Sequence, residues 1–184
     1  MALYIFDKDG TLVGGVNGRP ANKPDEQFPL DHVVAKIAAL RAAGHEVAIA
    51  SNQGGASWGF INAMQADELV KDAAIKCGVP PENTVCCCYE PRGKFAHLYA
   101  HEAKRRKPEP GMLNELMSDL GFSRHDTIMV GDRESDKRAA DLAGVRFVWA
   151  KDFFANDDVE DENFLPTDTL AKLRAGLDFE IDEE

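Results

Sequence analysis

The stretch Ala2-Leu3-Tyr4-Ile5-Phe6-Asp7-Lys8-Asp9-Gly10-Thr11 places a short apolar run directly before two carboxylates. The apolar part is typical of a buried β-strand. Side chains alternate along an extended chain, so Asp7 and Asp9 can project toward the same crevice if the chain stays extended beyond Phe6. Two carboxylates in one site can hold a divalent cation, or divide the work of a nucleophile and a general acid.

The residues after this strand permit a second interpretation. Gly10 allows a sharp turn, and the Thr11 hydroxyl can orient a carboxylate. Asp and Gly also favour turns for purely local reasons, so the same residues suit a solvated strand end. The motifs further along the chain distinguish a functional pair of carboxylates from a solvated strand end.

The rest of the chain alternates β-rich apolar runs with stretches of helical period. We expect further strands at 46–50, 84–88, 127–130 and 145–150, and helices at 30–43, 62–77, 94–105, 110–120 and 136–143. Strands separated by helices predict a doubly wound parallel sheet, a Rossmann-like α/β fold in three α/β/α layers. In such folds ligands bind beyond the carboxyl ends of the strands. Residues 151–166 look irregular, and 167–176 predict a last short helix.

Length and composition favour a single globular domain. The chain has 184 residues, of which 44% are hydrophobic and 29% charged, as is ordinary for a soluble domain. We expect one domain over 1–184, with a core at about 2–150 and an extension at 151–184. The apolar run at the N-terminus is too short for a signal peptide or a membrane span, which makes a cytoplasmic location the expectation and a membrane partner unexpected. The four cysteines are expected to be free thiols.

The charge balance bears on possible partners. The formal net charge is −11, and many of the acidic residues lie in an acidic tail within 152–184. An acidic protein binds polyanions weakly, because phosphate neutralisation supplies most non-specific affinity for nucleic acids. A local basic run, Lys104-Arg105-Arg106-Lys107, nevertheless keeps a nucleic acid among the candidate partners.

Two further motifs offer groups that suit a phosphate. Ser51-Asn52-Gln53-Gly54-Gly55 follows the second expected strand and supplies a hydroxyl, an amide and backbone N–H groups. Taken alone, it equally suits a helix cap or a turn. Downstream, Pro108 restricts the backbone of Lys107 and can point this cation at a fixed target. The alternative is a basic helix end that complements its own dipole.

The last motif is Gly131-Asp132-Arg133-Glu134-Ser135-Asp136, which follows the expected strand at 127–130. Asp132 is positioned to complete a magnesium site. Asp136 can cap the next helix or support Lys107. Four polar motifs, each at a strand end or loop that borders one crevice, favour a common site over separate turns.

With these motifs the chain resembles the haloacid dehalogenase superfamily of phosphohydrolases over residues 2 to about 150. The resemblance implies a magnesium-dependent phosphomonoester hydrolase that forms an aspartyl-phosphate on Asp7, while Asp9 protonates the leaving oxygen and then activates water. It implies magnesium held by Asp7, the backbone carbonyl of Asp9, and Asp132. Its other implied site residues are Thr11, Ser51, Asn52 and Lys107 for the phosphoryl group, with Asp136 in support.

The spacing of the motifs leaves little room for an inserted cap domain. A capless enzyme is therefore expected, with an open crevice shaped by loops at 13–27 and 54–61. Asn52-Gln53-Gly54-Gly55 and Arg106-Lys107-Pro108 look like the heptose-bisphosphate and histidinol-phosphate phosphatase branch, which implies a small phosphorylated metabolite as substrate and a role for Arg106 in recognising it.

That branch commonly carries a zinc-binding loop before the third motif. Here Tyr89, Ala103 and Arg105 stand where ligands would be expected. A different zinc site, made by Cys86, Cys88, His97 and His101, stays open, because histidines at i and i+4 can share one helix face. Against it, cysteines on a buried strand behave as small hydrophobic residues.

Two rival functions remain. A polynucleotide 3′-phosphatase uses the same core and an open site. A receiver-type signalling domain also forms an aspartyl-phosphate with magnesium, but it would place the phosphorylated aspartate after the third strand, where this chain has Cys88-Tyr89-Glu90.

Overall fold

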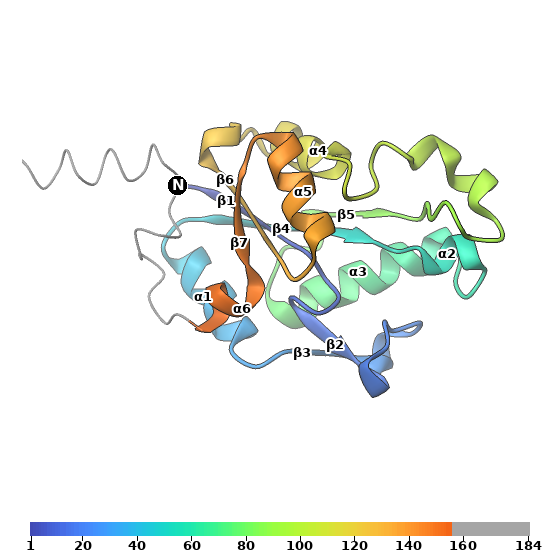
Figure 1. Cartoon of the computed structure of the whole chain (residues 1–184). Coiled ribbons are helices and arrows are strands. Elements are labelled where there is room, and N and C mark those ends of the chain that lie inside the picture. Colours follow the sequence, from blue (N-terminus) through green and yellow to red (C-terminus); the bar gives the residue numbers. More distant parts are fainter. Residues whose placement is uncertain (156–184) are drawn as a thin grey trace, which may run out of the picture.

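The computed structural model describes residues 1–155. Five parallel strands form its main sheet in the order β5-β4-β1-β6-β7 (Figure 1). Their bounds are β1 Leu3–Phe6, β4 Glu46–Asn52, β5 Thr84–Cys87, β6 Thr127–Gly131 and β7 Arg146–Trp149. The expected doubly wound α/β fold is confirmed. β1 lies at its centre, paired with β4 on one side and β6 on the other.

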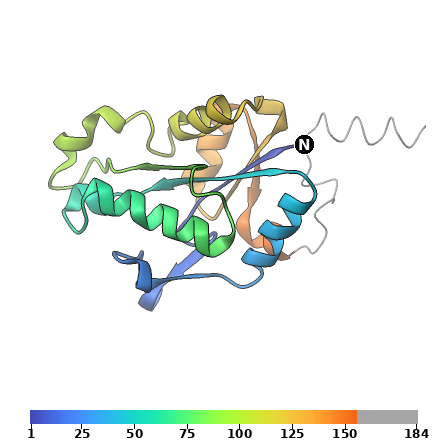
Figure 2. The same cartoon turned by 180° about the vertical axis from the view of Figure 1, so that it is seen from behind.

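Helices cover both faces of this sheet (Figures 1 and 2). One face carries α1 (Val33–Ala42) and α3 (Ala63–Cys77), and the other carries α4 (Gly111–Leu120) and α5 (Glu134–Ala143). All four β1 side chains are fully buried because both faces are covered. Tyr4 and Phe6 join the core beneath α1 and α3, whereas Leu3 and Ile5 join the core beneath α4 and α5.

Local sequence explains where α3 begins and ends. Asn62 and Gln65 form a reciprocal capping box, with both N–H to side-chain oxygen distances at 2.9 Å. Such a box satisfies two of the amide groups that the first turn of a helix leaves free. Gly78 ends the helix with φ of +80°, a left-handed conformation that glycine adopts without strain.

The segment expected as a helix at 94–105 is different. It forms a 3-10 helix, η3, only over Ala96–Glu102. None of the residues in η3 is buried, so no apolar stripe holds a regular α-helix against the core. The prediction of an α-helix there was wrong.

Other boundaries moved less. The helix expected from residue 30 begins at Val33, because the amide of Leu30 donates to the carbonyl of Leu12 at 2.9 Å. The loop expected at 13–27 contains two 3-10 turns, η1 (Val16–Gly18) and η2 (Pro24–Glu26), and starts with strand β2 (Val13–Gly15). β2 pairs antiparallel with β3 (Gln27–Pro29).

Three short elements complete the described chain: α2 (Gly55–Trp58), η4 (Arg124–Asp126) and α6 (Ala150–Ala155). α6 falls partly in the segment expected to be irregular. The short helix expected at 167–176 and most of the acidic tail lie outside the described residues. Within residues 1–155, no helix is both long enough and apolar enough to cross a bilayer.

Candidate active site

The carboxyl ends of the three central strands meet at one edge of the sheet. Asp7 directly follows β1, Ser51 and Asn52 end β4, and Asp132 directly follows β6. The backbone continues the pairing one residue past β1, since the amide of Asp7 donates to the carbonyl of Val130 at 2.9 Å. Segments distant in sequence are thereby brought together at the point where ligands bind in doubly wound sheets.

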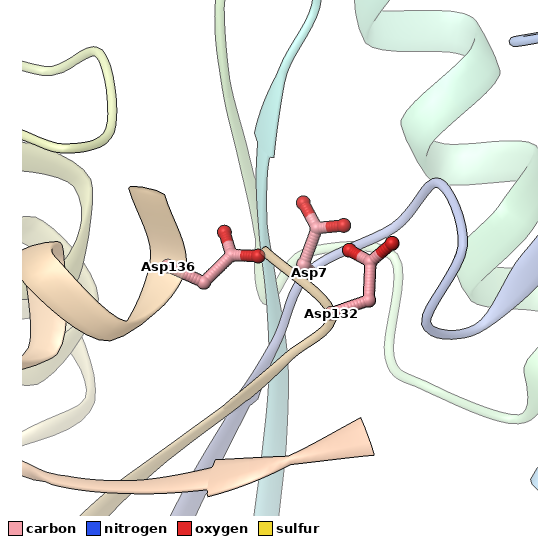
Figure 3. Close-up of side chains that lie close together, drawn as sticks. All are labelled: Asp7, Asp132 and Asp136. Carbon is pink, nitrogen blue, oxygen red and sulfur yellow. The ribbon is translucent and has the colours of Figure 1, made fainter. Parts of the chain in front are cut away.

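Three carboxylates gather there (Figure 3). Asp7, Asp132 and Asp136 each offer an oxygen atom within 4.8 Å of the others, and Asp7 lies between the other two. Asp7 and Asp136 are buried, and the side chain of Asp132 is 30% exposed. Burial, followed by the charge of Asp7, raises the pKa of Asp132 above its ordinary value. Like charges at this spacing repel each other, and a cation between them would relieve the repulsion.

Lys107 supplies one positive charge to this cluster. Its Nζ lies 2.6 Å from Asp7 Oδ1 and 2.7 Å from Asp136 Oδ1, and it also donates to the carbonyl of Ala50 at 2.7 Å. Burial alone would lower the pKa of Lys107, but the two carboxylates outweigh it and raise the pKa above its usual value. Lys107 is therefore held as an ammonium group against Asp7.

Asp136 performs both roles considered for it. One carboxylate oxygen pairs with Lys107, and the other accepts from the amide of Arg133 at 3.1 Å, at the start of α5. Gly131 makes room for this carboxylate, because a Cβ at position 131 would lie 2.5 Å from the Cβ of Asp136. Support for Lys107 and capping of the helix thus depend on the same side chain.

The amide group of Asn52 is bonded to the backbone of Lys107. Its Nδ2 donates to the carbonyl of Lys107 at 2.8 Å, and its Oδ1 accepts from the amide of Lys107 at 3.0 Å. These two bonds fix the backbone of Lys107. In this arrangement the Asn52 side chain holds the lysine loop, and one N–H of its Nδ2 takes no part in these two bonds.

Asp9 lies beside Asp7 at the crevice, with 18% of its side chain exposed. Lys8 Nζ lies 2.7 Å from Asp9 Oδ1, and Gln53 Nε2 donates to Asp9 Oδ2 at 3.1 Å. Gln53 also donates to the hydroxyl of Ser51 at 2.8 Å. Thr11 is buried, and its hydroxyl has no hydrogen-bond partner among the described residues.

A cleft of about 830 Å³ opens above these residues, and Asp7, Asp9 and Lys107 line its floor. Its rim comes from the segments expected as loops, one of which contains the short helix α2. The rim residues are Arg19–Asn22, Gly54–Gly55, Trp58, Phe60 and Ile61. Such a volume accommodates a small metabolite.

Arg106 also lines this cleft. Its guanidinium group donates to the carbonyl of Tyr89 at 2.7 Å and pairs with Glu90. Glu90 in turn accepts from Arg92 Nε at 3.1 Å. Burial alone would raise the pKa of Glu90, but Arg92 and Arg106 outweigh it and lower the pKa. Glu90 was not anticipated from the sequence, and it orients two arginines at the rim.

The alternative zinc site does not assemble. In residues 1–155, Cys86, Cys88, His97 and His101 form no group with ligand atoms close enough to share an ion. Cys88 is buried after β5, whereas His97 is exposed and the His101 side chain is 74% exposed. The histidines lie on η3, which does not bring them to the cysteines.

Comparison with known proteins agrees with the fold. A family model described as HAD-hydrolase-like matches residues 104–175. The chain is 26% identical over 148 residues to a D-glycero-beta-D-manno-heptose-1,7-bisphosphate 7-phosphatase of Pasteurella multocida, a match that covers 79% of this chain and 78% of that protein. It is 29% identical over 154 residues to an enzyme of the same name from Mesorhizobium japonicum, covering 82% and 69%.

Solved structures show the same fold. A D,D-heptose 1,7-bisphosphate phosphatase from B. bronchiseptica, complexed with magnesium and phosphate, superposes with a TM-score of 0.68 at 22% identity, covering 97% of this chain and 99% of that one. A D,D-heptose 1,7-bisphosphate phosphatase from Burkholderia thailandensis gives a TM-score of 0.51 at 23% identity, covering 79% and 76%.

The fold, the match of the family model to residues 104–175 and the named relatives show that the chain is similar to phosphatases of the haloacid dehalogenase type. Within that class, it is similar to the heptose-bisphosphate phosphatases.

Proposed function

We propose that the chain hydrolyses a small phosphomonoester in two steps, with Asp7 as nucleophile. An Asp7 carboxylate oxygen attacks phosphorus, the bond from phosphorus to the leaving oxygen breaks, and Asp9 gives its proton to that oxygen. Asp9 then takes a proton from water, the water oxygen attacks phosphorus, and the bond from phosphorus to Asp7 breaks. Inorganic phosphate leaves, and both carboxyl groups return to their starting states.

The observation that carries this proposal is the contact of Asp7 with Lys107, at 2.6 Å on the floor of the cleft. A fixed ammonium group beside the nucleophile can stabilise negative charge that moves onto the phosphoryl oxygens. Asn52 and Asp136 keep Lys107 in place, and the Ser51 hydroxyl lies at the next strand end. Asp9 lines the same cleft and is within reach of a leaving group.

The residues present fit a divalent cation. Three carboxylates face one ammonium group in the cluster, which leaves an excess of negative charge. Oxygen ligands of this kind suit Mg²⁺. We propose that Asp7 and Asp132 hold it, together with the backbone carbonyl of Asp9, while Asp136 stays with Lys107. When bound, magnesium would supply positive charge beside the transferring phosphoryl group.

We propose a phosphorylated sugar as the substrate class. The relatives are named as phosphatases of heptose 1,7-bisphosphates, and four arginines line the cleft here: Arg19, Arg92, Arg106 and Arg133. Guanidinium groups recognise phosphate with paired hydrogen bonds. A substrate that carries a second phosphate therefore suits this rim.

A substrate panel tests the proposal. The protein is assayed with Mg²⁺ on sugar monophosphates and bisphosphates, histidinol phosphate, nucleotides and 3′-phosphorylated oligonucleotides. We expect the highest kcat/KM on a sugar bisphosphate and no turnover after chelation of the metal. Preference for the oligonucleotide would instead identify a polynucleotide 3′-phosphatase, and full activity in the presence of a chelator would contradict the magnesium site.

A further inference from the structure

Lys8 stands between the two catalytic candidates in sequence but does not face the cleft. Its side chain is completely buried, and it is absent from the residues that line the cleft. The backbone turns at this point, since the amides of Leu12 and Val13 both donate to the carbonyl of Lys8. The ammonium group of Lys8 contacts Asp9 Oδ1 at 2.7 Å. Lys8 is therefore placed to act on a substrate through Asp9 rather than by direct contact.

A second buried side chain holds Lys8 from behind. Gln27, at the start of β3, accepts from Lys8 Nζ through Oε1 at 3.0 Å. The amide nitrogen of Gln27 donates to the carbonyl of Leu69 at 2.8 Å and to Asp72 Oδ2 at 2.7 Å, both on α3. The amide group is therefore used at both ends, which fixes its orientation and leaves its oxygen facing Lys8. A continuous chain of contacts connects α3 to Asp9.

The Asp9 carboxylate is held on both oxygens. Lys8 binds Oδ1, and Gln53 binds Oδ2 at 3.1 Å. A short, partly exposed side chain without such partners would sample several rotamers, and each wrong one would withdraw the proton donor from the reacting atoms. Orientation of a reacting group contributes strongly to rate, and a displacement of about 1 Å can lower it by about 100-fold.

We propose that Lys8 is a positioning residue that fixes the carboxylate of Asp9 for proton transfer, and that Gln27 holds Lys8 in place for this purpose. The proposal rests on the proposed function, in which Asp9 is the proton donor and acceptor. It assigns a catalytic consequence to two buried residues that do not line the cleft.

The experiment compares Lys8→Met, Gln27→Leu, Asp9→Asn and the Lys8→Met/Asp9→Asn double variant, with p-nitrophenyl phosphate and Mg²⁺. The leaving group of this substrate departs without a proton, so a residual rate stays measurable without Asp9. We expect Lys8→Met to lower kcat by about 10- to 100-fold, and Gln27→Leu by about 3- to 10-fold, with KM changed less than about 3-fold. Phosphorylated enzyme should accumulate in both variants, because the second step needs Asp9 to take a proton.

The double variant separates positioning from a general loss of structure. If Lys8 acts through Asp9, Lys8→Met should leave the residual rate of Asp9→Asn unchanged to within about 2-fold. An equal loss in both backgrounds would overturn the proposal, and so would wild-type kcat in Lys8→Met. If Lys8→Met fails to fold, Gln27→Leu and its combination with Asp9→Asn answer the same question. Wild-type activity in Asp9→Asn would instead refute the proposed role of Asp9.

Lys71 provides a matched control. It lies on α3 and pairs with Asp67 at 2.7 Å, on the surface. Lys71→Met removes the same charge without touching Asp9, and we expect its kcat and its phosphoenzyme level to equal those of the wild type.

Discussion

Two lysines are buried next to the proposed catalytic carboxylates, and their surroundings differ. Lys107 reaches the floor of the cleft from the loop before α4 and contacts two carboxylates, Asp7 and Asp136. Lys8 is buried away from the lining of the cleft, with one carboxylate and one amide as partners. In the proposed reaction the first ammonium group meets the phosphoryl group directly, whereas the second orients a residue that does. Burial of a cation therefore does not by itself reveal its role, and the partners must be compared.

The largest effects on kcat are expected from substitution of the carboxylates that the two lysines contact, and the losses should differ between them. Asp7→Asn removes the proposed nucleophile, and we expect kcat to fall by about 10⁴-fold or more while the fold is kept. Asp9→Asn removes the proposed proton donor and should lower kcat by roughly 10²- to 10⁴-fold on substrates with poor leaving groups. Steady-state kinetics with circular dichroism checks both. An Asp7→Asn enzyme with most of its activity would refute the assignment of the nucleophile.

Substitution of the two lysines themselves should lower the free energy of unfolding by different amounts. Lys107→Met leaves Asp7 and Asp136 buried without their cation, and we expect a loss of about 3–5 kcal/mol in the free energy of unfolding without metal. Lys8→Met should lose only about 1–3 kcal/mol, because Asp9 keeps its bond from Gln53 and is partly solvated. Urea denaturation in the presence of a chelator measures both. A larger loss for Lys8→Met would reverse this comparison.

Magnesium should stabilise the folded protein whether or not the Lys8 side chain is present. At a concentration about 100 times its dissociation constant, a bound ion stabilises the folded state by about 2.7 kcal/mol. We expect a corresponding rise in melting temperature for the wild type and for Lys8→Met, and a much smaller rise for Asp132→Asn. Asp119→Asn, a change to an exposed carboxylate on α4, is the control and should respond like the wild type.

The smallest effect on kinetics is expected from substitution of Arg106, which precedes Lys107 on the same loop. Arg106→Ala removes a rim guanidinium group that Glu90 orients. We expect KM for a sugar bisphosphate to rise by about 10-fold, while KM for p-nitrophenyl phosphate changes by less than about 2-fold. Equal effects on the two substrates would show that Arg106 supports the loop rather than reading a second phosphate.

The sequence was sufficient for those parts of the site that depend on strand ends. Asp7, Ser51 and Asp132 come together because the carboxyl ends of neighbouring parallel strands share one edge of the sheet. Periodicity reveals the strands, and the polar residues after them mark that edge. The structure added the position of Asp136, whose carboxylate lies within the acidic cluster as well as capping α5.

Contacts between side chains that are distant in sequence could not be predicted from the sequence. Nor could the bonds between the Asn52 amide and the backbone of Lys107, a residue 55 positions away, be predicted in this way. The pairing of Lys8 with Gln27 depends on how β3 packs against α3, and no local pattern encodes it. The helix expected at 94–105 failed for a similar reason, because its period was not matched by burial against the core.

The rim of the cleft and its floor come from different classes of structure. The floor is built from the ends of β1, β4 and β6, whereas the rim comes from the surface segments at Arg19–Asn22 and Trp58–Ile61. Evolution can lengthen or replace such segments without moving the reacting groups, since loops tolerate insertions far better than packed strands. An engineer who wants another substrate for this scaffold should therefore graft loops and leave the central strands untouched.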